Sequence, residues 1–137
     1  MKIFLKTEDE INLMRKANQL VGLTLAELGK HIKPGVTTLH LDRIAEEFIR
    51  DHGAIPTFKN FPNPYGESFP ASICTSINDV VVHGIPSDND VLDDGDIISI
   101  DCGTLLDGYN GDSCYTFAVG DISEQKRKLL EVTKKSL

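Results

Sequence analysis

The chain has 137 residues and a formal net charge of −7, so it has room for one domain with a modest core. An acidic chain without a basic stripe cannot neutralise phosphates, which excludes nucleic acid as a main partner. Its contents of 40% hydrophobic and 26% charged residues are ordinary for a globular protein, and no apolar stretch approaches the roughly 20 residues that span a membrane.

The N-terminal part of the sequence predicts two helices. Thr7 begins a Thr-x-x-Glu capping box, and apolar residues then recur at helical spacing as far as Gly29. Pro34 follows and prevents the helix from continuing. A second helix is predicted to begin at Thr37 and to stop at Gly53, a residue type that favours helix C-termini.

The middle of the chain predicts two strands separated by a loop. Residues 54–58 read as a short edge strand, because Pro56 is tolerated only at an edge or a strand start. Residues 59–70 combine three prolines with aromatic side chains, which either cover the core or line an apolar pocket. A strand over residues 72–82 then ends at His83, which is either a displayed catalytic group or a histidine bonded to nearby backbone.

Two aspartates flank a predicted β-hairpin turn at Asp107-Gly108, a dipeptide that suits turns in which both central residues need positive φ. In this register Asp101 faces Cys114 and Asp112 faces Gly103. Asp101 and Asp112 then share one face as diagonal neighbours, roughly 7–8 Å apart at the backbone. Carboxylates that close repel each other, and two divalent metals about 3.5–4 Å apart would fit between them.

A different turn would separate the two aspartates, so that they could not share a metal site. If Asn110-Gly111 formed the turn, Asp101 would pair near Gly120, far from Asp112. A strand carboxylate is also commonly a cap or a solvated edge residue. The Asp107-Gly108 register is favoured because it separates an apolar face from a polar one. The apolar face carries Ile98, Ile100, Cys102, Tyr115, Phe117 and Val119, and the polar face carries Ser99, Asp101, Gly103, Asp112, Cys114 and Thr116.

The last part of the chain predicts a third helix that begins at residues 121–123 and is still in helical register at Leu137. We therefore expect the chain to be truncated. The three cysteines show no Cys-x-x-Cys spacing and cannot all pair with one another, so a reducing cytoplasm is the simplest setting. Each cysteine is expected to be a small buried hydrophobe.

Several segments together resemble the type I methionine aminopeptidases. The most specific part of the resemblance is the spacing of His83, Asp101 and Asp112. It runs in order over essentially the whole chain but covers only the N-terminal half of the family. The matching segments are residues 8–17, 32–38, 72–86, 92–101 and 107–112.

The resemblance implies an α/β (α+β) architecture, the N-terminal half of the pita-bread (creatinase/aminopeptidase) fold, with an antiparallel sheet covered by helices. Residues 1–137 would form the N-terminal half of a methionine aminopeptidase catalytic domain. In this fold two related halves lie about a pseudo-twofold axis, with the metal site between them. The family's remaining ligands, a histidine and two glutamates, lie further along the chain than Leu137, so the isolated chain is expected to be inactive and to hold metals weakly.

The resemblance also implies roles for individual residues. Asp101 would chelate one divalent metal and Asp112 would bridge two, the metals being Co, Mn, Fe or Zn. His83 would contact the substrate and steady the tetrahedral intermediate that a metal-bridged hydroxide forms. Phe69 and Cys74 would line the methionine pocket.

Further assignments concern Phe61 or Tyr65 as additional pocket residues. The backbone carbonyls of Asn78 and Val80 would hold a monovalent cation. The implied reaction removes the initiator methionine from nascent polypeptides with a small second residue, in the cytoplasm and at or near the ribosome. Two alternatives stay open: a non-catalytic binding module of the same fold, and self-association through the surface where the other half would dock.

Overall fold

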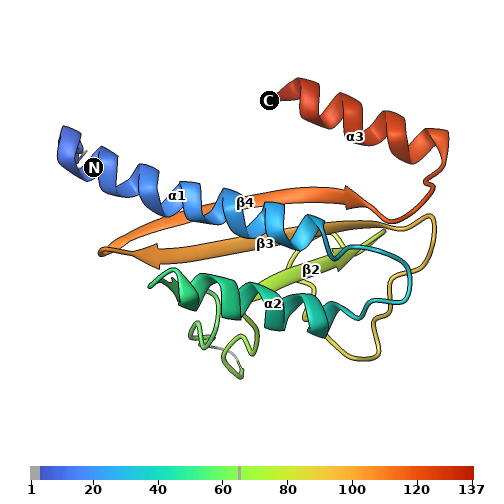
Figure 1. The fold of residues 1–137 in the computed structure, drawn as a ribbon, viewed down its shortest axis with the longest axis horizontal. Helices are drawn as coiled ribbons and strands as arrows, with labels where there is room; N and C mark the ends of the chain where they lie inside the picture. Colours follow the sequence, from blue (N-terminus) through green and yellow to red (C-terminus); the bar gives the residue numbers. More distant parts are fainter. Residues whose placement is uncertain (1–3, 65) are drawn as a thin grey trace.

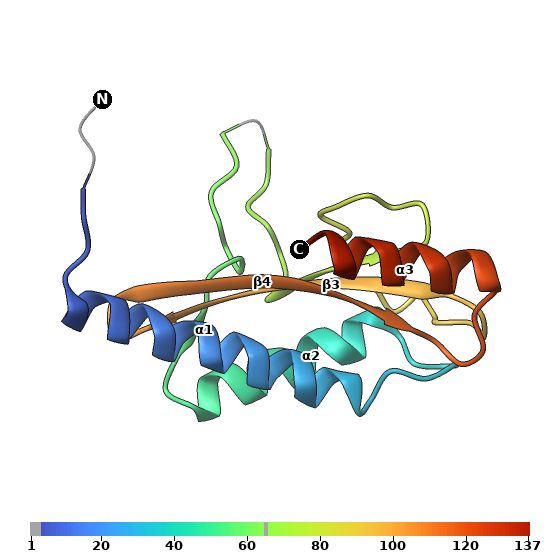
Figure 2. The ribbon, with the colours of Figure 1, turned by 90° about the horizontal axis from the view of Figure 1, so that it is seen from above.

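The computed structural model describes residues 4–64 and 66–137, which form a mixed α/β fold. One four-stranded antiparallel sheet has α1 and α2 on one face, while α3 and two long loops lie on the other (Figure 1, Figure 2). The expected class, an antiparallel sheet covered by helices, is confirmed. The elements are α1 (Glu8–Gly29), α2 (Thr38–Asp51), β1 (Ile55–Pro56), β2 (Ile73–Ile77), β3 (Ile97–Leu106), β4 (Tyr109–Ala118) and α3 (Glu124–Ser136). Within the described ranges no helix is both long and apolar enough to cross a bilayer.

The helices begin where the capping residues predict. Thr7 Oγ1 accepts from the backbone N–H of Glu10 at 3.3 Å, and the Glu10 carboxylate accepts from the N–H of Thr7 at 2.7 Å, which completes the capping box. Thr37 caps α2, and Ser123 caps α3. Gly53, with φ 74°, follows the last turn of α2 in the left-handed conformation that ends helices.

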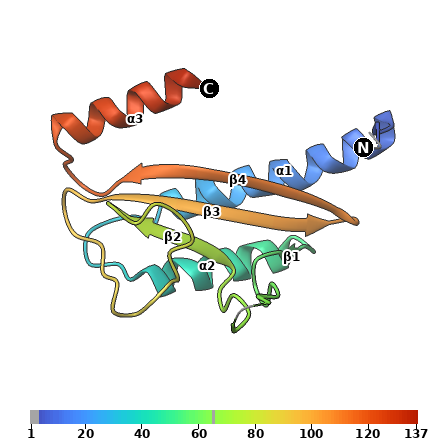
Figure 3. The same cartoon turned by 180° about the vertical axis from the view of Figure 1, so that it is seen from behind.

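The hairpin of β3 and β4 has the register that places the two aspartates on one face. Asp107 and Gly108 have φ of 52° and 80°, as the two-residue turn requires, and Asp101 pairs with Cys114 while Asp112 pairs with Gly103. The predicted turn is confirmed, and the alternative turn at Asn110-Gly111 is wrong. β3 is the central strand, with β4 along one side and both β1 and β2 along the other (Figure 3).

The core lies between the sheet and the two helices α1 and α2. The apolar face of β3 contributes Ile98, Ile100 and Cys102, all fully buried as predicted. Tyr115 was expected beside them but is 49% exposed, because β4 is the edge strand and the Tyr115 ring packs edge-on against Phe117 rather than under a helix. The helices bury Val21, Leu25, Leu28, Leu41, Ala45 and Ile49 against this face.

The strand predicted over residues 72–82 is shorter than expected, since β2 ends at Ile77. Asn78 has φ 51°, and its side chain accepts from the N–H of Ile97 and donates to Asp96, which closes the end of the sheet. The apolar run Val80-Val81-Val82 therefore lies outside the sheet, and all three side chains are exposed. Hydrophobicity alone did not mark the end of the strand, because Asn78 ends β2 before the apolar run begins.

A buried carboxylate joins α2 to the start of β2. Asp42 Oδ1 accepts from the backbone N–H groups of Ser72 and Ile73 at 2.8 and 3.0 Å. Burial raises the pKa of Asp42 above its ordinary value of 3.8, and the two N–H donors offset only part of that rise.

The raised pKa makes a prediction about stability and pH. Protonated Asp42 contributes stability that is fully present below the unfolded-state pKa and is lost as pH rises through the higher folded-state pKa. Asp42→Asn keeps the acceptor oxygen but does not titrate, so we expect the variant to gain stability relative to the wild type as pH rises through this window. Denaturant unfolding at a series of pH values measures the difference; a difference independent of pH would contradict a raised pKa.

Gly111 allows α1 to pack closely against the hairpin. A Cβ at Gly111 would lie 2.5 Å from the carbonyl carbon of Ala17, and the neighbouring Thr104 hydroxyl donates to the Ala17 carbonyl at 3.1 Å. The contact between α1 and β4 thus depends on a residue without a side chain.

Paired alanine substitutions test this contact. We expect Gly111→Ala to lower the free energy of unfolding by at least about 2 kcal/mol, because backbone must move to admit the methyl group. Gly22 lies in α1 with no atom within 4 Å of its would-be Cβ, so Gly22→Ala should raise stability by about 1 kcal/mol through helix propensity. Thermal and urea unfolding of both variants checks the opposite signs, and equal effects would refute the close approach.

Candidate functional site

On the face of the sheet opposite the core, a carboxylate lies in a row between two thiols. Cys74 on β2 pairs with Asp101 on β3, and Asp101 pairs with Cys114 on β4. Asp112 lies diagonally from Asp101 on the same face, because side chains alternate along each strand. The register therefore brings together the two aspartates that the sequence singled out.

Asp101 is half-buried and Asp112 is exposed, and the environment of Asp101 disfavours its negative charge. Burial raises the pKa of Asp101, and the Asp112 carboxylate raises it further, against the opposing effects of His83 and the Cys102 N–H. Within the described part of the chain, no lysine or arginine forms an ion pair with either aspartate. Oxygen ligands of this kind, with unbalanced negative charge, suit a divalent cation.

His83 reaches the carboxylates because the loop after β2 folds back along that strand. The Thr75 N–H donates to the Gly84 carbonyl at 2.8 Å, and the Gly84 N–H donates to Ser76 Oγ at 3.2 Å. A Cβ at Gly84 would lie 1.9 Å from the Thr75 carbonyl oxygen, so only glycine fits. His83 itself has φ 60°, and its imidazole forms no hydrogen bond with the described residues, which leaves it available.

An apolar pocket of about 640 Å³ lies over the carboxylates. Phe69 and Cys74, both predicted as pocket residues, line it, and so does Phe61. Tyr65, the alternative to Phe61, lies outside the described residues. The pocket is lined by Phe58, Phe61, Phe69, Cys74, His83, Ile85, Asp101 and Asp112, so it combines aromatic walls with an ionisable floor.

The sequence reading missed two pocket residues, Phe58 and Ile85. The signal for Phe58 was Gly103, which faces Asp112 on the open side of the hairpin. A Cβ at Gly103 would lie 2.8 Å from the Phe58 ring, so this glycine makes room for the aromatic wall. Ile85 follows Gly84 directly, and no pattern in the sequence indicates which way its side chain points.

Of the two cysteines on this face, Cys74 lines the pocket and Cys114 lies outside it. All three cysteines of the chain are free. Burial, followed by the negative charge of Asp101, raises the pKa of Cys74 to about 12, so its thiol stays protonated and binds metals poorly. Cys114 is exposed, which corrects the expectation that every cysteine is buried: its place on the open face of the edge strand β4 leaves it uncovered.

The residues present fit one side of a metal site. Two carboxylates offer hard oxygen donors in fixed register, and among the described residues neither forms an ion pair with a lysine or arginine. Among the residues that the structure describes, however, no group of three or more His, Cys, Asp or Glu side chains is arranged to hold a metal ion. Further ligands would be needed for tight binding.

The turn after β2 carries the two residues expected to hold a monovalent cation, Asn78 and Val80. The Val80 N–H donates to the Ile77 carbonyl at 3.0 Å, which forms the turn. Lys126 of α3 donates to the Asn78 side-chain oxygen at 2.9 Å and to the Gly95 carbonyl at 2.6 Å. The cation site at the backbone carbonyls stays a prediction.

Comparison with known proteins identifies relatives along nearly the whole chain. A sequence model described as "Metallopeptidase family M24" matches residues 12–137. Methionine aminopeptidase of Clostridium acetobutylicum is 58% identical over 134 residues, which cover 98% of this chain and 52% of that protein. Methionine aminopeptidase 1 of Bacillus subtilis is 54% identical over 135 residues, with coverage of 98% and 52%.

Solved structures show the same relationship. The crystal structure of methionine aminopeptidase from Rickettsia prowazekii superimposes with a TM-score of 0.90 at 42% identity, covering 98% of this chain and 52% of that one. Aminopeptidase P from E. coli, at 22% identity and a TM-score of 0.76, shares the fold. The chain spans about half the length of the curated relatives it matches.

The carboxylate pair predicts how the chain binds a divalent metal. We expect Asp101→Asn and Asp112→Asn each to weaken Mn²⁺ binding by about 10-fold or more, because each removes a charged oxygen donor. Affinity should also fall as pH falls, since protons compete for Asp101, whose pKa is raised.

Calorimetric titration with Mn²⁺ at several pH values measures both effects. Asp107→Asn is the matched control, because it removes a nearby carboxylate while Asn-Gly keeps the hairpin turn. Equal losses in the control and in the two site variants would contradict a specific site on the open face.

Proposed function

This chain belongs to metallopeptidase family M24, and on that premise we propose that residues 1–137 form the N-terminal half of a methionine aminopeptidase catalytic domain. The resemblance read from the sequence, to methionine aminopeptidases and their pita-bread α/β fold, is confirmed by these relatives. The observation that carries the proposed activity is the convergence of Asp101, Asp112 and His83 on one apolar pocket.

We propose that Asp101 and Asp112 hold divalent metal, with Asp112 bridging two ions, and that the rest of a full-length protein supplies the remaining ligands. When bound, such metals lower the pKa of water and polarise a carbonyl group. The raised pKa of Asp101 supports this role, because a dication would relieve the repulsion between the two carboxylates. Asp101 and Asp112 alone do not select among Co, Mn, Fe and Zn, so metal selectivity would depend on the ligands that the rest of a full-length protein supplies.

The chain's own residues would bind and orient the substrate. The aromatic walls at Phe61 and Phe69 would bury the methionine side chain, and the protonated Cys74 thiol offers a soft contact for its sulfur. An N–H of the His83 imidazole would donate to the oxygen that gains negative charge when the scissile amide is attacked. Strain at His83, held at φ 60° by the Gly84 contact, fits a preorganised donor.

The substrates that follow from this proposal are the N-termini of nascent polypeptides with a small second residue. Cleavage would take place in the cytoplasm, at or near the ribosome. The isolated chain would self-associate through the surface where the other half of a full-length protein would dock. A non-catalytic binding module, the alternative weighed from the sequence, gains no support from the relatives, which are named as aminopeptidases.

Cleavage of Met-Ala-Ser tests the proposal. We expect the 137-residue chain alone to show near-zero turnover with Mn²⁺, and a protein of the relatives' length that contains it to release methionine. In that protein His83→Ala should lower kcat by about 100-fold, the usual effect of losing an oxyanion donor. His40→Ala, at an exposed position on α2, is the control and should leave kcat unchanged.

An inactive protein of full length, with metal supplied, would refute the aminopeptidase assignment. Retention of full activity by His83→Ala would refute the role of this histidine and leave the assignment of the family intact.

A further inference from the structure

The loop that supplies the aromatic walls is attached to α2 at both of its ends. At the first end, Lys59 Nζ lies 2.5 Å from Glu46 Oε2, and both side chains are partly buried. At the second end, Asp42 Oδ1 accepts from the N–H groups of Ser72 and Ile73. Asp42 and Glu46 are four residues apart on α2, so they project from the same face of the helix one turn apart.

Between these attachments, the two ends of the loop are joined by backbone hydrogen bonds among the described residues 60, 61 and 69. The Asn60 N–H donates to the Phe69 carbonyl at 2.8 Å, and the Phe69 N–H donates to the Phe61 carbonyl at 3.1 Å. Phe61 and Phe69 are therefore coupled to each other and to the attachment at Lys59. Both line the pocket that also contains the two carboxylates.

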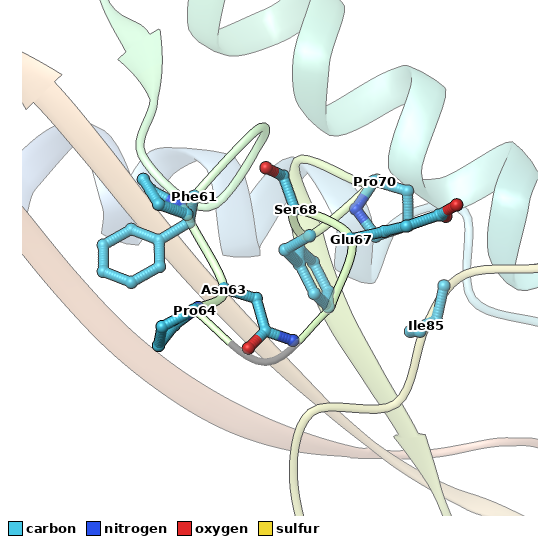
Figure 4. A pocket seen from close by; sticks show the side chains of 9 residues that line it. Phe61, Asn63, Pro64, Glu67, Ser68, Pro70 and Ile85 are labelled. Atoms are coloured by element: carbon cyan, nitrogen blue, oxygen red, sulfur yellow. The ribbon is translucent and has the colours of Figure 1, made fainter.

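The described part of the loop borders a hollow as well as the pocket over the carboxylates. Its own residues, with Ile85, surround a second hollow of about 440 Å³ on the other side of the aromatic wall (Figure 4). In Figure 4, Phe61 and Pro64 lie on one side of this group of side chains, and Glu67, Pro70 and Ile85 lie on the other. A wall with open space on both sides gains few dispersion contacts, so its position depends on its attachments.

We propose that Glu46 and Asp42 are positioning residues that act across the sheet: they hold the aromatic loop and thereby set the width of the pocket over the carboxylates. They touch no part of that pocket, and α2 lies on the opposite face of the sheet (Figure 2). The Glu46–Lys59 ion pair joins two side chains, so substitution of either partner removes it. Asp42, in contrast, binds backbone N–H groups that no substitution at Ser72 or Ile73 other than proline removes. We call the attachment of the loop to α2 through Asp42 and Glu46 the clamp. The clamp does not depend on the proposed function, whereas its consequence for side-chain selectivity does.

Hydrogen–deuterium exchange of the 137-residue chain tests the clamp without any enzymatic assay. We expect Glu46→Gln and Lys59→Met each to speed exchange in residues 60–69 by about five-fold, as loss of a partly buried ion pair would. The double variant should exchange no faster than either single variant, because both remove one interaction. Exchange in α1 and in the β3–β4 hairpin should not change.

Two control variants separate the clamp from other effects. Arg50 also binds Glu46, through Oε1 at 2.9 Å, so Arg50→Met tests whether that contact matters to the loop, and Glu47→Gln removes an exposed charge next to Glu46. Both should leave exchange in residues 60–69 unchanged. Unchanged exchange in Glu46→Gln and Lys59→Met, or additive effects in the double variant, would overturn the clamp.

Selectivity is measured in a protein of the relatives' length. Glu46→Gln should reduce the preference for Met-Ala-Ser over Leu-Ala-Ser by about five-fold through KM, with kcat for Met-Ala-Ser changed less than two-fold. Faster loop exchange with unaltered preference would overturn the effect on pocket width. A wild-type protein that cleaves neither peptide would overturn the proposed function and the selectivity claim together, while the exchange result would still decide the clamp.

Discussion

The register of the β3–β4 hairpin is the constraint on which the rest of the molecule depends. The turn at Asp107 and Gly108 fixes which residues face each other, and a slip of one residue would move every side chain to the other face of the sheet. In the observed register Ile98 and Ile100 enter the core while Asp101 and Asp112 share the open side. One turn therefore specifies both the hydrophobic core and the candidate metal site.

The two faces of the sheet divide stability from chemistry. α1 and α2 cover one face, where burial of aliphatic side chains provides the main driving force for folding. This support allows the other face to hold two neighbouring carboxylates, an arrangement that is unfavourable in itself, as the raised pKa of Asp101 indicates. The helices on the opposite face thus hold in place the strands that carry the two carboxylates.

Contacts between distant segments of the chain bring the remaining site residues into place. Gly84 permits the loop after β2 to lie against Thr75, which delivers His83 to the pocket. Gly103 leaves the space that Phe58 occupies beside the carboxylates. The aromatic loop, held from α2 by Asp42 and Glu46, closes the pocket from a third direction.

Local rules were sufficient for much of this protein. Helix starts at Thr7, Thr37 and Ser123 follow from capping chemistry, and the Asp-Gly turn with alternating polarity places the two aspartates together, because these signals act over a few residues. The resemblance to the family follows from several segments taken together, and its most specific part is the spacing of His83, Asp101 and Asp112 along the chain.

Only the tertiary structure decided the rest. The end of β2 at Ile77 depends on Asn78 bonding to β3, and the exposure of Cys114 depends on β4 being an edge strand. The membership of Phe58 and Ile85 in the pocket likewise depends on contacts between distant segments. Such contacts leave no periodic pattern in the sequence, because each is set by the partner segment rather than by the residue's own neighbours.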